Sequence, residues 1–197
     1  KGLSHAIRNS NDVISLAQTA EGALQETSNI LVRMRELAVQ AANGTLNSGD
    51  RANLQVEFSA LYTEVDRLAQ ATKFNNVGLM DAATTFTFQI GAGTTGNDQI
   101  TVSTSEMRAS TLIGDSLGVA PDVGGSTGSN ALAALTNLDS AINTITTTRA
   151  RYGAAINRSS AVISSLSIAV ENQSAARGRI VDVMDSEKGD HVEIFFE

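Results

Sequence analysis

Apolar residues recur at alternating spacings of three and four through the first forty or so residues of this chain, with no proline to interrupt them. Ten of the twelve repeat positions between residues 3 and 41 are apolar, and the two exceptions are Ser10 and Thr27. This spacing is that of one helix face, and the apolar stripe is wide enough to require more than one partner helix. We therefore predict a helix over residues 3–43, about 60 Å long.

A second segment, residues 48–72, has the same spacing. Ser48 or Asp50 is suited to begin this helix, and Gly44 is suited to end the preceding one as a left-handed cap. The connection is short, so the two helices are expected to pack antiparallel. The apolar positions are Leu54, Phe58, Leu61, Val65 and Leu68. The charged residues expected on the opposite, outer face are Arg51, Glu57, Glu64, Asp66 and Arg67.

The third periodic segment, residues 130–183, predicts a helix about 80 Å long that Asn130 can cap. A helix of this length cannot be enclosed by a chain of 197 residues, so we expect it to lie along the other two. The predicted fold is mainly α, an elongated rod of three long antiparallel helices packed coiled-coil fashion. Leu31, Leu61 and Ile163 are expected in the seam that all three helices share. The full predicted core set is Leu24, Leu31, Met34, Phe58, Leu61, Val65, Ile145, Ile156, Ile163 and Leu166.

Glycine, threonine and serine dominate the segment between the second and third helices. Alternating apolar residues on either side of a glycine-rich loop predict a β-hairpin over residues 84–103, at one end of the rod. Residues 104–129 are expected to form a short irregular insert. The loop sequence Gly91-Ala-Gly93-Thr-Thr-Gly96 matches the dinucleotide-binding fingerprint, but a strand follows it where that motif needs a helix N-terminus. We interpret it as a hairpin loop.

Charge and composition exclude several classes of function. The chain has 21 acidic and 14 basic residues and a formal net charge of −7, which argues against nucleic acid as a partner. It has no cysteine and only two histidines, so we expect no catalytic residues, no cofactor and no metal site. No apolar run approaches the roughly 18 residues that a membrane-spanning helix needs, so membrane insertion is not expected.

Four runs of sequence then resemble bacterial flagellin, in the order in which that family has them. They are ISLAQTAEGALQ at residues 14–25, ILVRMRELAVQAANGT at 30–45, EVDRLAQATKFNNV at 64–77 and SAARGRIVDV at 174–183. The resemblance implies a self-assembling structural subunit of the flagellar filament, exported through the flagellar secretion channel to the cell exterior for motility, with other flagellin subunits as partners.

The resemblance also implies boundaries for the rod. Residues 1–183 are interpreted as the flagellin rod domain and residues 184–197 as a non-family tail, either added or specific to one lineage. The chain is expected to be a fragment that lacks the terminal helices of intact flagellins. An alternative remains open, because a helical coiled-coil adaptor would explain the periodicity equally well, although it would not explain the ordered motif matches. An enzyme on a helical scaffold would need a constellation of residues that the sequence lacks.

Flagellins of this kind are targets of innate immune recognition, because Toll-like receptor 5 binds the outer face of their first two rod helices. The matching positions here are Arg33, Leu37 and Glu57. The resemblance implies that Arg33 offers a fork of hydrogen-bond donors, that Leu37 is an apolar anchor and that Glu57 faces outward. Val32 stands where the family usually has a polar residue, which is expected to weaken this contact.

Overall fold

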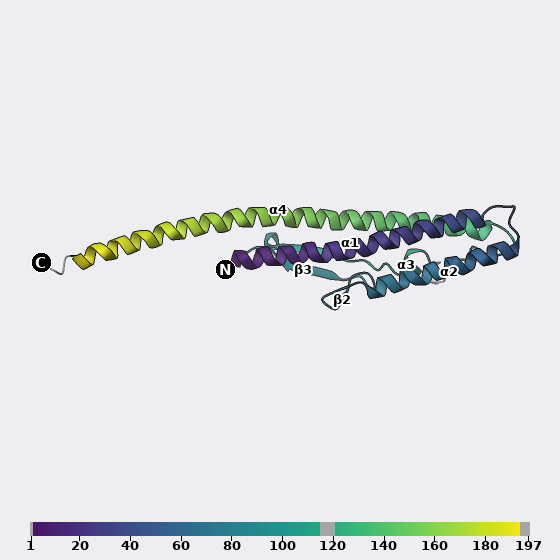
Figure 1. The fold of residues 1–197 in the computed structure, drawn as a ribbon, viewed down its shortest axis with the longest axis horizontal. Helices are drawn as coiled ribbons and strands as arrows, with labels where there is room; N and C mark the ends of the chain where they lie inside the picture. Colours follow the sequence, from purple (N-terminus) through teal and green to yellow (C-terminus); the bar gives the residue numbers. More distant parts are fainter. Residues whose placement is uncertain (1, 115–120, 194–197) are drawn as a thin grey trace.

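The computed structural model describes residues 2–114 and 121–193, so part of the predicted insert (115–120) and the last residues of the predicted tail lie outside the described residues. The protein is mainly helical with a small antiparallel hairpin, as predicted. Three long helices, α1 (Gly2–Ala41), α2 (Ser48–Ala71) and α4 (Ser129–Glu193), form an elongated rod (Figure 1). α1 runs opposite to α2 and α4, and α4 extends well beyond the start of α1 (Figure 1).

The ends of the helices differ from the sequence-based predictions. Asn47, rather than Ser48, caps α2, since its side chain accepts the Asp50 N–H at 2.9 Å while the Asp50 carboxylate accepts the Asn47 N–H at 3.2 Å. This reciprocal pair is a capping box. Gly44 does not adopt the left-handed conformation that was expected of it. The predicted tail is helical as far as Glu193, because residues 184–193 contain no proline and a single glycine does not end a helix.

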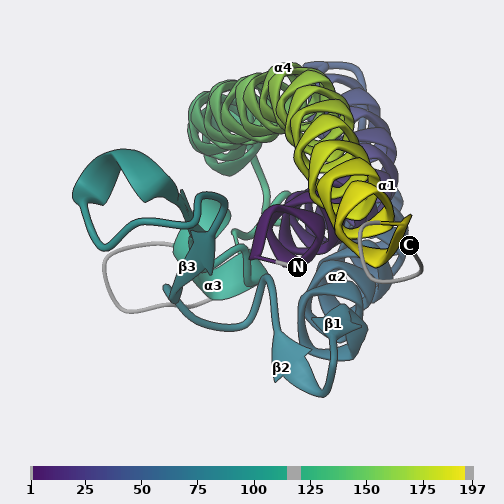
Figure 2. The same cartoon turned by 90° about the vertical axis from the view of Figure 1, so that its left-hand side faces the viewer.

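Helix α1 is central, because it packs along α4 on one side and against α2 on another (Figure 2). Its repeat positions from Ala6 to Ala41 are all buried, including the two polar exceptions. Ser10 and Thr27 satisfy their buried hydroxyl groups within the helix, by donating to the carbonyl oxygens of Ala6 and Ala23, each at 2.9 Å. Small hydroxyl residues are therefore compatible with the core at these two positions.

Two short antiparallel pairs follow α2. Strands β1 (Lys73–Phe74) and β2 (Val77–Gly78) are joined by Asn75 and Asn76, both with positive φ, which is the conformation of a tight two-residue hairpin turn. Strands β3 (Thr85–Gln89) and β4 (Gln99–Ser103) form the predicted hairpin. This hairpin lies along the flank of the rod, beside α1, instead of extending from its end (Figure 1). Strand β3 contacts α1 and strand β4 contacts α4.

The insert is part of the core, although its sequence has no pattern that predicts this. Its short helix α3 (Ala109–Leu112) contacts both α2 and α4, and the Ala109 N–H donates to Asp66 Oδ1 at 2.8 Å. Three of its side chains, Met107, Ile113 and Val123, are fully buried. The expected seam shared by three helices is therefore not formed evenly, because the insert occupies space between α2 and α4.

Burial of the predicted core residues follows this arrangement. Six of them lie at 1% exposure or less, namely Leu24, Leu31, Met34, Phe58, Val65 and Ile145. Four are only half-buried, namely Leu61, Ile156, Ile163 and Leu166. The first group lies where α1 is covered by its neighbours. Most of the second group lies further along α4, where the cover decreases.

Candidate interaction surfaces

The outer face of α1 and α2 carries a charged cluster that joins the two helices. The Arg33 guanidinium pairs with Glu57 Oε1 of α2 at 2.7 Å and with Glu36 Oε2 of its own helix at 3.1 Å. The hydrogen bonds to Glu57 and then to Glu36 raise the pKa of Arg33. The side chains of Arg33 and Glu57 are 50% and 46% exposed, so a partner molecule can reach both. They form a single unit, since Glu57 is already paired with Arg33.

Leu37 does not lie on this surface. Its side chain is 1% exposed and belongs to the core of the rod. The role implied for it as an apolar surface anchor is therefore wrong for this conformation. The repeat explains its burial, since Leu37 follows Met34 by three residues and precedes Ala41 by four, and both of these are buried.

Arg51 also departs from its predicted position, because it is buried at 2% exposure instead of facing solvent. Its guanidinium donates to three backbone carbonyl oxygens, those of Ala41 (2.8 Å), Asn43 (2.9 Å) and Ser126 (3.2 Å). A cation is favourable there, because the C-terminal carbonyls of α1 carry partial negative charge. The sequence held a signal for this burial, since Arg51 precedes Leu54 by three residues and so continues the apolar repeat.

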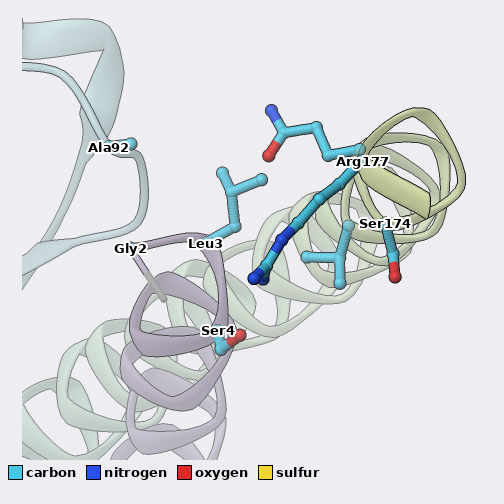
Figure 3. A pocket seen from close by; sticks show the side chains of 8 residues that line it. Gly2, Leu3, Ser4, Ala92, Ser174 and Arg177 are labelled. Carbon is cyan, nitrogen blue, oxygen red and sulfur yellow. The ribbon is translucent and has the colours of Figure 1, made fainter. Parts of the chain in front are cut away.

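The second exposed surface is the distal arm, which we define as residues 160–184 of α4. Several large apolar side chains are exposed along it, namely Ile168, Ile180, Val181, Val183 and Met184. At the level of Arg177 the arm faces the start of α1 across a groove of about 430 Å³. The Arg177 side chain reaches toward Leu3 and Ser4 of α1 (Figure 3). Beyond this groove, the described chain offers the arm no partner helix (Figure 1).

Neither a metal centre nor a membrane helix is found in the part of the chain that the structure describes. Among those residues, no group of three or more His, Asp or Glu side chains is placed to hold a metal ion. None of the described helices is both long enough and apolar enough to cross a membrane.

These features define a rod-shaped, mainly helical protein whose exposed surfaces are suited to contact with other proteins. The sequence profile of the bacterial flagellin N-terminal helical region matches residues 1–85. Flagellin of Halalkalibacterium halodurans is 39% identical over 93% of this chain and 65% of its own length. The flagellar filament 30.7 kDa core protein of Treponema maltophilum is 34% identical over 92% of this chain and 67% of its own length.

A solved structure supports the same assignment. The crystal structure of Bacillus cereus flagellin superposes with a TM-score of 0.65 at 30% identity, and the match covers 86% of this chain and 94% of that one. The chain belongs to the bacterial flagellin family. It spans about two thirds of the length of the two relatives from H. halodurans and T. maltophilum.

Proposed function

We propose that this protein is a structural subunit of the bacterial flagellar filament, and not an enzyme. Its membership of the flagellin family supports this function. The observation that carries the proposal is the apolar distal arm, which remains exposed in the single chain. Ile180, Val183 and Met184 lie together on the arm, and large apolar side chains exposed together on a helix mark a surface that another protein covers. In a filament, neighbouring subunits would supply that cover.

Two finer features belong to the same proposal. We infer that α1, α2 and α4 pack in coiled-coil fashion, which is supported by the 3–4 spacing of the buried positions along α1. We also infer an extracellular location reached through the flagellar secretion channel. The absence of cysteine from all 197 residues is compatible with export as an unfolded chain, because no disulfide has to be broken or formed.

Labelling and complementation in the bacterium that encodes this chain test the function. An antibody against the chain should decorate the length of its flagellar filaments in electron micrographs. In a strain without filaments, expression of the full-length gene should restore them. Ile180→Asp in the exposed arm should shorten or abolish the filaments, whereas Ser140→Asp, exposed on α4 outside the arm, should have little effect. Wild-type filaments that exclude the chain would refute the proposal.

We further propose, as a second function, that Toll-like receptor 5 recognises the Arg33–Glu57 face. The observation that favours it is the half-exposed ion pair between α1 and α2, which presents both donors and acceptors to a partner. Arg33 provides a planar fork of donors suited to carboxylate or carbonyl acceptors. In this proposal Leu37 acts indirectly, by holding α1 in place beneath the pair.

Receptor binding measured with purified variants tests this second function. Arg33→Ala should weaken binding, whereas Arg67→Ala should not. Arg67 is the matched control, because it is also exposed and paired with a glutamate, Glu64, at 2.6 Å on α2. Circular dichroism would verify that both variants keep their helical content. Equal affinity of the two variants and the parent would show that the receptor does not use this face.

A further inference from the structure

The loop between α1 and α2 contains the sole Asn-Gly pair in the sequence, Asn43-Gly44. Both residues are exposed, and Gly44 has open space around it, since a Cβ added there would meet no atom within 4 Å. An asparagine side chain can be attacked by the backbone nitrogen of the following residue. A glycine in that position offers the least steric resistance to the attack, because it has no side chain.

The hydrogen bonds around this loop favour that attack. The carbonyl oxygen of Asn43 accepts from Arg51 Nη2 at 2.9 Å and from the Leu46 N–H at 3.3 Å. This carbonyl belongs to the same peptide group as the Gly44 N–H, which must lose its proton before its nitrogen can attack. Loss of that proton spreads negative charge over nitrogen and oxygen. A guanidinium bonded to the oxygen stabilises this charge, as preorganised donors do in oxyanion holes.

The side-chain carbonyl group of Asn43, which is the group attacked, also accepts a hydrogen bond. Asn43 Oδ1 accepts the Thr45 N–H at 3.2 Å, which draws electron density away from the side-chain carbonyl carbon Cγ. The same hydrogen bond holds the side chain over the backbone that follows it, which is the direction of the attack. Arg51 is held by its other two acceptors, the carbonyl oxygens of Ala41 and Ser126, so it is in place before the reaction begins.

We propose that Asn43 is a site of intramolecular deamidation in the folded protein, with Arg51 as a positioning residue. The Gly44 nitrogen forms a bond to Asn43 Cγ, the bond from Cγ to Nδ2 breaks, and ammonia leaves with the proton that Gly44 gives up. The product is a five-membered succinimide. Solvent water then adds its hydroxyl to one of the two ring carbonyl carbons, that carbon's bond to the ring nitrogen breaks, and the nitrogen regains a proton. The chain ends with aspartate or isoaspartate at residue 43.

Either product changes the connection between α1 and α2. A carboxylate at residue 43 adds a negative charge next to the Arg51 guanidinium. Isoaspartate also adds one methylene to the backbone between Asn43 and Gly44, and so moves a carbonyl that Arg51 holds. Because Arg51 joins the end of α1, this loop and the insert before α4, the modification alters the packing at this end of the rod.

Peptide mapping by mass spectrometry during incubation at mildly alkaline pH tests the proposal. Products should accumulate at residue 43 and not at Asn47, which is also exposed but is engaged in the cap of α2. Gly44→Ala should largely abolish them while keeping the fold, since the added Cβ has open space. The rate in the folded protein should exceed the rate in urea at the same pH, because only the fold brings Arg51 to the loop. A folded rate equal to or below the urea rate would overturn the proposal.

The Arg51→Lys variant tests the role of Arg51 separately. Lysine keeps the charge but loses the fork that reaches three carbonyl oxygens, so deamidation of the folded variant should be several-fold slower than in the parent. In urea the two proteins should react at the same rate. If circular dichroism shows that the variant does not fold, the comparison of the folded parent with the unfolded parent decides alone. Equal rates in the two folded proteins would refute the role of Arg51.

Discussion

The two halves of α4 have the same spacing of apolar residues, but they differ in how much of the apolar face is buried. Up to Ser159, the repeat positions are buried or half-buried against the rest of the rod, and Leu138, Ile145 and Tyr152 are almost fully covered. In the distal arm, no described side chain is fully buried and Ile180 is 62% exposed. Periodicity therefore indicates which face of a helix is apolar. It does not indicate where along the helix a partner covers that face.

The position of α1 accounts for the difference. The first residues of α1 lie level with Ser174 and Arg177 of α4, on either side of the groove in Figure 3. The proximal half of α4 packs against α1 on one side and against β4 and α3 on others. The arm instead continues past the start of α1 (Figure 1). Its stability as a helix in the filament would then depend on contacts between subunits.

The largest expected effect on stability comes from replacing one isoleucine by alanine in each half of α4 and comparing the two variants. Ile145→Ala removes a fully buried side chain and should lower the free energy of unfolding by about 2–5 kcal/mol, because it leaves a cavity. Ile180→Ala in the arm should change it by no more than about 0.5 kcal/mol, because water already contacts that side chain. Chemical denaturation of both variants measures the difference. Equal losses would mean that the arm is packed in solution.

Ile163 lies just beyond the last fully buried position of α4 and sharpens the same comparison. It is half-buried, so Ile163→Ala should cost about 1–2 kcal/mol, between the values for Ile145 and Ile180. Leu61→Ala on α2 should fall in the same range, because that side chain is also half-buried. If both variants lose as much stability as Ile145→Ala does, the three helices share their seam evenly, as the sequence predicts.

Much of the fold was predictable because the strongest signal, the 3–4 repeat, depends only on neighbouring residues. It places the three long helices within a few residues of their ends, except at the end of α4. Tertiary contacts account for what it misses. Met107, Ile113 and Val123 are isolated apolar residues in an irregular segment, and no local period indicates that they enter the core.

The surface residues also show that sequence patterns predict tertiary contacts only in part. The family resemblance brought Arg33 and Glu57 together correctly on one face, and they form an ion pair. It placed Leu37 on the surface, although the spacing of Leu37 from the buried Met34 and Ala41 indicated burial. For Arg51 the repeat likewise indicated burial. Its charge suggested the opposite, because arginine is rarely buried without a partner.

Ser159, the last fully buried repeat position of α4, should show a gain in stability. Its hydroxyl oxygen has no hydrogen-bond partner among the described residues, which is unfavourable for a buried polar group. Ser159→Ala should therefore raise the free energy of unfolding by up to about 1 kcal/mol. Ser10→Ala on α1 is the control and should give no gain, because the Ser10 hydroxyl donates to Ala6 at 2.9 Å. A loss at Ser159 would mean that its hydroxyl is satisfied in solution.

The smallest expected effect concerns Tyr152, where the proximal half should lose stability at alkaline pH. Burial raises the pKa of the Tyr152 phenol above its ordinary value, so the folded state holds this proton more tightly than the unfolded chain. Its contribution is complete below the unfolded pKa of about 10 and declines as pH rises through the folded pKa. Melting temperatures recorded as pH rises past 10 should thus fall less in Tyr152→Phe than in the parent. An alkaline decline in Tyr152→Phe as steep as in the parent would show that this phenol is not the cause.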